Sequence, residues 1–179
     1  MEEQQPIAGM VSREQLQEWV KQRRERTKTV PVQEQKVKMV LFSLAGVWYA
    51  FFCSNVREIL DISKRTVIFV PGSPHFIAGI INVRGIIQSI IDPYRLLGLA
   101  REKENTERHA IIIHHEAFQT GIRVDFIEEV MDIPQSALQP GNEWAINDTL
   151  RELVHYAFTY RDRHVAVLDV AKMAQLIQR

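Results

Sequence analysis

Two heptapeptides in this chain, VREILDI at residues 56–62 and IEEVMDI at residues 127–133, follow one pattern. In each, an aliphatic residue precedes a charged residue, a glutamate, two aliphatic residues, an aspartate and an isoleucine. Residue 127 lies 71 positions after residue 56. A second pair of segments also matches, IID at residues 90–92 and VLD at residues 167–169. Their aspartates lie 77 positions apart, which is close to the spacing of the heptapeptides. The two matches indicate an internal duplication.

Short runs of β-branched and aromatic residues surround both copies. They are VKMVLFSL (37–44), VWYAFFCS (47–54), TVIFVP (66–71), GIINV (79–83), IIQSII (86–91), HAIIIHH (109–115), TGIRVDF (120–126), VHYAFTY (154–160) and HVAVLD (164–169). Many short strands with frequent turns are typical of an all-β barrel or sandwich. Together with the duplication, they predict a pair of small β-barrels.

Helices are predicted where each half ends and at the start of the chain. Asp92 precedes a proline and is followed by Gly98, a pattern of N-cap, first-turn proline and C-terminal glycine. Asp169 precedes the helical stretch VAKMAQLI. Residues 12–28 predict a further helix, because Ser12 and Gln15 have the spacing of a capping box.

The predicted fold class is therefore mainly β, with short capping helices and an extra N-terminal helix. The expected divisions are a helical extension and linker at 1–36, one domain at 37–179, a first lobe at about 37–100, a second lobe at about 105–168, and a C-terminal helix at about 170–178 that packs on the lobes.

The composition argues against several classes of protein. Lys plus Arg and Asp plus Glu both total 22, so the chain lacks the basic excess that nucleic-acid binding requires. A single cysteine excludes an internal disulfide framework and fits a reducing compartment. No apolar run reaches the length of a membrane span, and the first residues do not resemble a signal peptide. We therefore expect a cytoplasmic protein that does not insert into the membrane.

No motif indicates catalysis or a cofactor. Adjacent residues of a strand point to opposite faces, so His114 and His115 do not readily share one metal ion. The chain contains no GxSxG, no GxxxxGK[ST] and no GxGxxG. Cys53 lies among aromatic residues and is interpreted as a packed thiol. We expect no cofactor and no metal, and an interaction protein rather than an enzyme.

One arginine requires an explanation, because Arg84 lies between the isoleucine-rich runs of GIINVRGIIQSIID at residues 79–92. A buried arginine without a partner would cost several kcal/mol. Glu58, in the first heptapeptide, is its natural partner, and Gly85 would permit a tight turn beside it. Two interpretations stay open: the pair holds the first lobe together, or it faces a binding partner.

Over roughly residues 37–178, the chain resembles a known family, the CheW-like adaptor domains. The matching segments are Val56-Arg57-Glu58-Ile59-Leu60, Val70-Pro71, GIINVRG at 79–85, Ile91-Asp92, Leu97-Gly98-Leu99, Gly121, Val124-Asp125, Glu129-Val130 and Val167-Leu168-Asp169.

The resemblance implies two SH3-like five-stranded β-barrel subdomains and a role without catalysis. Similar proteins couple the cytoplasmic tip of a chemoreceptor to the regulatory domain of a CheA-type histidine kinase, in clusters below the inner membrane. In that family, the positions of Glu58 and Arg84 lie close together and take part in receptor coupling. Swimming chemotaxis and a related pilus or surface-motility pathway both stay open.

We expect the receptor tip to bind an apolar groove between the two lobes, and the kinase to contact the second lobe. The residues predicted to form the groove are Val56, Gly79, Ile80, Asn82, Val83, Gly85 and Ile86. Two alternatives are a small-ligand-binding or hydrolytic β-barrel and the regulatory module of a larger kinase. The absence of catalytic spacing and of kinase motifs argues against them.

Overall fold

The computed structural model describes residues 17–18, 34–101, 108–141, 143, 145 and 147–178. Contacts divide the chain into two units, Met1–Glu34 and Gln35–Arg179. The predicted N-terminal helix at 12–28 lies outside the described residues, except for residues 17–18, which are helical. The second unit holds both sheets and the sites discussed below.

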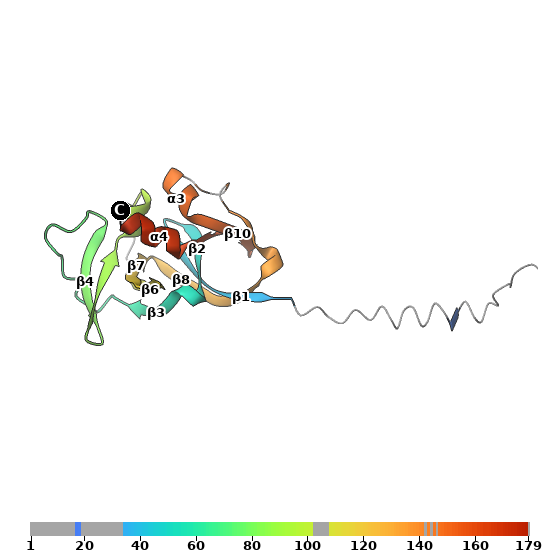
Figure 1. Cartoon of the computed structure of the whole chain (residues 1–179), viewed down its shortest axis with the longest axis horizontal. Helices are drawn as coiled ribbons and strands as arrows, with labels where there is room; N and C mark the ends of the chain where they lie inside the picture. The colour runs from blue at the N-terminus through green and yellow to red at the C-terminus, as the bar shows by residue number, and fades with distance from the viewer. Residues whose placement is uncertain are drawn as a thin grey trace, which may run out of the picture. The chain divides into compact units, whose positions relative to one another are not determined.

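The second unit consists mainly of two β-sheets (Figure 1). The six-stranded sheet has the order β8-β1-β2-β11-β10-β9, and the five-stranded sheet has the order β3-β6-β7-β5-β4. The strands are β1 (Lys36–Leu44), β2 (Val47–Phe52), β3 (Val56–Asp61), β4 (Ile77–Val83), β5 (Ile86–Ile91), β6 (His109–His115), β7 (Phe118–Val124), β8 (Phe126–Pro134), β9 (Gln139–Pro140), β10 (Val154–Tyr160) and β11 (Arg163–Leu168). The predicted mainly β fold with two small subdomains is confirmed, and β9 adds the sixth strand.

The two sheets share one topology. In each, a strand with the repeated heptapeptide, β3 or β8, pairs with the first strand of a hairpin, β6–β7 or β1–β2. The second strand of that hairpin pairs in parallel with β5 or β11, which forms an antiparallel pair with β4 or β10. The duplication in the sequence is therefore repeated in the order and direction of the strands.

The lobe boundaries at 37–100 and 105–168 need correction, because each sheet takes a hairpin from the other half of the chain. The β1–β2 hairpin completes the six-stranded sheet, whereas β6–β7 completes the five-stranded sheet. The two hairpins occupy equivalent places and have similar apolar patterns. The repeat alone therefore does not reveal which sheet each hairpin joins.

This exchange creates a core that both sheets share. Alternate residues of β1 enter different clusters: Phe42 belongs to the largest cluster, and Leu41 to a cluster of the six-stranded sheet. In β6, Ile111 belongs to the largest cluster, and Ile112 to a cluster of the five-stranded sheet. Strands that are buried on both faces require nearly continuous apolar runs, which explains VLF in β1 and AIII in β6.

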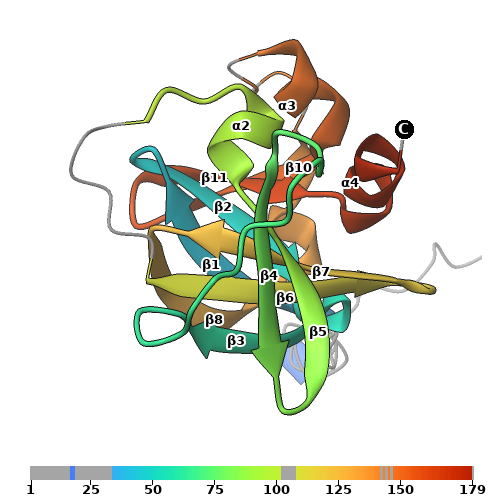
Figure 2. The same ribbon diagram turned by 90° about the vertical axis from the view of Figure 1, so that its left-hand side faces the viewer.

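Three short helices lie at one end of the sheets (Figure 2): α2 (Pro93–Leu97), α3 (Asp148–Leu153) and α4 (Val170–Ile177). The predicted caps are confirmed. The Asp92 carboxylate accepts a hydrogen bond from the Tyr94 amide, and the Asp169 carboxylate accepts hydrogen bonds from the amides of Ala171 and Lys172. Gly98 ends α2 with a left-handed φ of 64°. Both halves therefore end in a strand, a capping aspartate and a helix.

The segment before β4 passes close to that strand. Ile68 exchanges two backbone hydrogen bonds of 2.8 Å with Ile80, so this segment covers the outer side of β4. Gly79 makes the approach possible, because a Cβ atom there would lie 2.9 Å from the Ile68 carbonyl carbon and still closer to its oxygen. Gly79 also has a φ of 148°, which disfavours other residues.

We predict that Gly79→Ala lowers the free energy of unfolding by about 3 kcal/mol, because it combines backbone strain with a steric clash. Gly72→Ala is the matched control, since Gly72 has a φ of 79° but a Cβ atom added there would have no other atom within 4 Å. It should cost only about 1 kcal/mol. Urea denaturation of both variants measures the difference, and equal losses would contradict the close approach of Ile68 to β4.

Candidate functional site

Arg84 lies at the tip of the β4–β5 hairpin and not inside a strand. It has a left-handed φ of 54°, and Gly85 follows with a φ of 87°. Two residues with positive φ are the mark of the tight hairpin turn whose twist suits the adjoining strands. The Asn82 side chain accepts a hydrogen bond of 2.7 Å from the Gly85 amide. Asn82 and Gly85 therefore build the turn that presents the Arg84 side chain.

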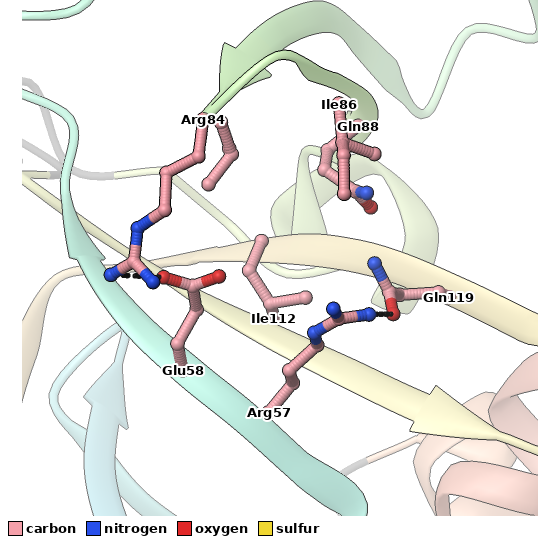
Figure 3. A pocket seen from close by; sticks show the side chains of 8 residues that line it. Arg57, Glu58, Arg84, Ile86, Gln88, Ile112 and Gln119 are labelled. Carbon is pink, nitrogen blue, oxygen red and sulfur yellow. Dashed lines mark hydrogen bonds and ion pairs between the residues drawn. The ribbon is translucent and has the colours of Figure 1, made fainter.

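Arg84 forms an ion pair with Glu58. Its guanidinium lies 3.5 Å from the Glu58 carboxylate, with exposures of 84% for the Arg84 side chain and 23% for that of Glu58. Glu58 belongs to β3, and Arg84 directly follows β4. Because β3 and β4 are the two edge strands of the five-stranded sheet, the ion pair connects both edges of this sheet. Figures 2 and 3 show the hairpin tip close to β3. An ion pair this exposed contributes little to stability.

A β-bulge in β3 directs two charged neighbours to the same side. Val56 pairs with Ile113 and Glu58 with Ile112, so Arg57 is an extra residue without an opposite partner. Figure 3 shows the Arg57 and Glu58 side chains both extending into the pocket described next. The Arg57 guanidinium donates a hydrogen bond of 2.7 Å to the side-chain oxygen of Gln119. Strict alternation along the strand would have placed Arg57 on the opposite face from Glu58.

These side chains surround a pocket of about 340 Å³ on the five-stranded sheet (Figure 3). Its apolar part includes Val83 and Ile112, which are buried, and Ile86, which is exposed. The residues that line the pocket are Arg57, Glu58, Val83, Arg84, Ile86, Gln88, Ile112 and Gln119. The site therefore combines an apolar floor with a charged and amide-bearing rim, an arrangement suited to binding and without an evident nucleophile or acid–base pair.

The location differs from the expected groove between the lobes. Of the predicted groove residues, Val83 and Ile86 line the pocket together with the predicted pair Glu58 and Arg84. Ile80 and Asn82 do not, because the twofold alternation of β4 places them on the other face from Val83. The remaining predicted residues serve the fold: Val56 packs against the core, Gly79 admits Ile68, and Gly85 forms the turn.

Four lining residues were missing from the sequence-based prediction: Arg57, Gln88, Ile112 and Gln119. The sequence contains weak evidence that Arg57 belongs to the site, because this residue stands next to Glu58 in the repeated heptapeptide. The other three lie on β5, β6 and β7, and only the pairing of these strands brings them together.

The six-stranded sheet carries a counterpart of this site. Arg161 lies at the tip of the β10–β11 hairpin with a φ of 47°, and it forms ion pairs of 3.3 Å with Glu128 and 3.6 Å with Glu129. Leu41 pairs with Glu129 and Phe42 with Ile127, so β8 has its bulge at Glu128. Arg161 lies 77 positions after Arg84, and Glu128 lies 71 after Arg57, as in the sequence repeat. The duplication therefore extends to the bulge and the ion pair.

Aromatic side chains occupy this second site. Trp48 takes the position of Gln119, and Tyr160 takes that of Val83, as the strand registers show. The Arg161 guanidinium lies 4.9 Å from the centre of the Tyr160 ring, and that of Arg163 lies 5.0 Å from the centre of the Trp48 ring. The Tyr160 hydroxyl donates to Glu129, and this hydrogen bond raises the pKa of Tyr160 above its ordinary value. The two sites thus share a frame but differ in their side chains.

Within the described part of the chain, no helix has the length and apolar character needed to cross a membrane. Among the same residues, no three His, Cys, Asp or Glu side chains gather in a way that could hold a metal ion.

Comparisons with known proteins place the chain in a family. Residues 38–178 match the sequence profile of the CheW-like domain. The chain is 31% identical to the chemotaxis protein CheW of Bacillus subtilis over 112 residues, which cover 63% of this chain and 70% of that protein. It is 26% identical to the chemotaxis protein CheW of Helicobacter pylori over 140 residues, with coverages of 78% and 82%.

A solved structure shows the same relationship. The scaffolding protein TtCheW from Thermoanaerobacter tengcongensis superposes with a TM-score of 0.67 at 27% sequence identity, and the match covers 75% of this chain and 90% of that one. The family match spans the strands, both sheets and the candidate site. The chain therefore belongs to the CheW-like domain family, and the CheW proteins that it resembles are adaptor and scaffolding proteins and not enzymes.

Proposed function

We propose that this protein couples the cytoplasmic tip of a chemoreceptor to a CheA-type histidine kinase, and that the receptor tip docks at the pocket beside Arg84. The proposal places the protein in the cytoplasm, at receptor clusters below the inner membrane, without insertion into the membrane and without a nucleic-acid partner. Membership of the CheW-like family supports the adaptor role. The exposure of the Arg84 side chain at the rim of the pocket carries the choice of this pocket.

Arg84 adopts the left-handed backbone conformation that the hairpin turn requires. A left-handed φ costs a residue with a side chain roughly 1 kcal/mol relative to the ordinary regions. The ion pair with Glu58 returns little of this, because the Arg84 side chain is 84% exposed. The turn explains the backbone conformation, whereas the exposed guanidinium beside the pocket is available for contact with a partner.

The pocket suits one face of a helix. Helical partners place apolar residues three and four positions apart against a groove. The apolar floor beneath Arg84 and the exposed side chain of Ile86 offer such contacts at the pocket. Receptor tips are helical hairpins in the systems that use this family, so their side chains match this surface in kind.

The kinase would use a different surface, so that both partners bind at once. We place that contact on the six-stranded sheet, where β8 exposes Phe126 and Val130. No chemistry is required of the adaptor. It transmits a signal only to the extent that its affinity differs between the states of the receptor or the kinase.

We predict that Arg84→Glu weakens binding of a soluble receptor-tip fragment by at least about tenfold, because it places a second carboxylate beside Glu58 and removes the guanidinium. Arg151→Glu is the matched control, since Arg151 lies on α3 and pairs there with Asp148. Isothermal titration calorimetry measures both variants. Unchanged affinity in a folded Arg84→Glu protein would contradict the proposed docking site.

A stability measurement separates this role from a structural one. Arg84→Ala should change the free energy of unfolding by less than about 1 kcal/mol, as expected for an exposed pair. Asp92→Ala should cost about 2 kcal/mol or more, because the Asp92 side chain is 7% exposed, caps α2 and pairs with Arg101 at 2.9 Å. If chemical denaturation gave the two variants equal losses, Arg84 would have a structural role instead.

A further inference from the structure

The pocket on the five-stranded sheet holds more positive than negative charge. Its charged lining residues are two arginines, Arg57 and Arg84, and one carboxylate, Glu58. The Glu58 carboxylate pairs with Arg84. Gln88 and Gln119 complete the polar lining and are neutral. The pocket therefore carries an excess of one positive charge, and this charge belongs to Arg57.

Arg57 has donors left over for a ligand. A guanidinium has five N–H donors in a planar fork. Among the described residues, Arg57 makes one hydrogen bond, to the Gln119 side chain at 2.7 Å, and has no carboxylate within ion-pair distance. In Figure 3 the Arg57 guanidinium extends towards Gln119, with Ile112 between it and Glu58. The guanidinium is thus held in place by an amide while its charge stays uncompensated.

We infer that Arg57 binds a carboxylate of the docked partner, an aspartate or glutamate on the receptor-tip helix. The inference rests on the proposed docking of that tip at this pocket and adds the chemistry by which it is recognised. A carboxylate matches the guanidinium fork and compensates the excess charge. The neighbouring apolar side chains of the same helix would lie on Ile112 and Ile86.

The counterpart site supports this assignment independently. Glu128 takes the position of Arg57 in the second copy of the bulge, and it pairs with Arg161 at 3.3 Å. An acidic side chain that approached this position would meet a carboxylate instead of a guanidinium. The two sites share a backbone frame but differ in charge at this position. An acidic helix should therefore bind more tightly to the five-stranded sheet than to the six-stranded sheet.

A double-mutant cycle tests the inference with the full-length protein and a soluble receptor-tip hairpin. Arg57→Gln should weaken binding about tenfold at low salt, and less at high salt, because the contact is electrostatic. Each acidic residue of the hairpin is then changed singly to its amide. One of these changes should weaken binding of the hairpin to the unmodified protein by a similar factor. The same change should leave the affinity of the hairpin for the Arg57→Gln protein almost unaltered.

The controls separate charge from folding. Arg151→Gln removes an arginine outside the pocket and should bind normally. Arg57→Lys keeps the charge but not the fork and should show an intermediate affinity. Gln119→Ala leaves the bulge intact and removes the amide that holds Arg57, so it should weaken binding about twofold to threefold even if Arg57→Gln failed to fold.

The outcomes distinguish this inference from the proposed function. Normal binding by folded Arg57→Gln, or no coupling to any acidic residue of the hairpin, would overturn the inference and leave docking at Arg84 standing. If the unmodified protein did not bind the hairpin at all, both would fall. Coupling of Arg57 to one acidic residue supports both.

Discussion

The exchange of hairpins between the two halves is the constraint on which the rest of the structure depends. Neither half can complete a sheet alone, because β5 pairs in parallel with β7 and β11 with β2. The exchange buries both faces of β1 and β6, and the largest core cluster contains residues of both halves. It also fixes the site, because the pocket needs Ile112 and Gln119 from the second half opposite Glu58 and Arg84 from the first.

The same backbone frame gives two different surfaces. Both sheets have a bulge in the heptapeptide strand and an arginine with positive φ at a hairpin tip. In the five-stranded sheet, the small Val83 and the flexible Gln119 leave a pocket between the charged groups. In the six-stranded sheet, Tyr160 and Trp48 stand at these positions and stack with arginines. The two copies therefore share a backbone geometry, and the difference in side chains leaves a pocket in the five-stranded sheet.

The sequence allowed the duplication, the mainly β fold, the two capping aspartates and the pairing of Arg84 with Glu58 to be predicted, because each depends on local patterns or on the repeat. It did not reveal the hairpin exchange, since equivalent hairpins fit either sheet. It also did not reveal that Arg57 shares a face with Glu58, because a one-residue bulge has no clear sequence signature. The pocket lies on one sheet, whereas the sequence predicted a groove between the lobes.

The most direct test of the account is a methyl NMR titration of the Ile, Leu and Val side chains with an unlabelled receptor-tip hairpin. The account predicts that the methyl signals of Val83, Ile86 and Ile112 shift on binding. Those of Leu41 and Val165, the counterparts of Ile112 and Gln88 in the six-stranded sheet, should remain in place. Shifts confined to Leu41 and Val165, or no shifts in Val83, Ile86 and Ile112 at saturation, would contradict it.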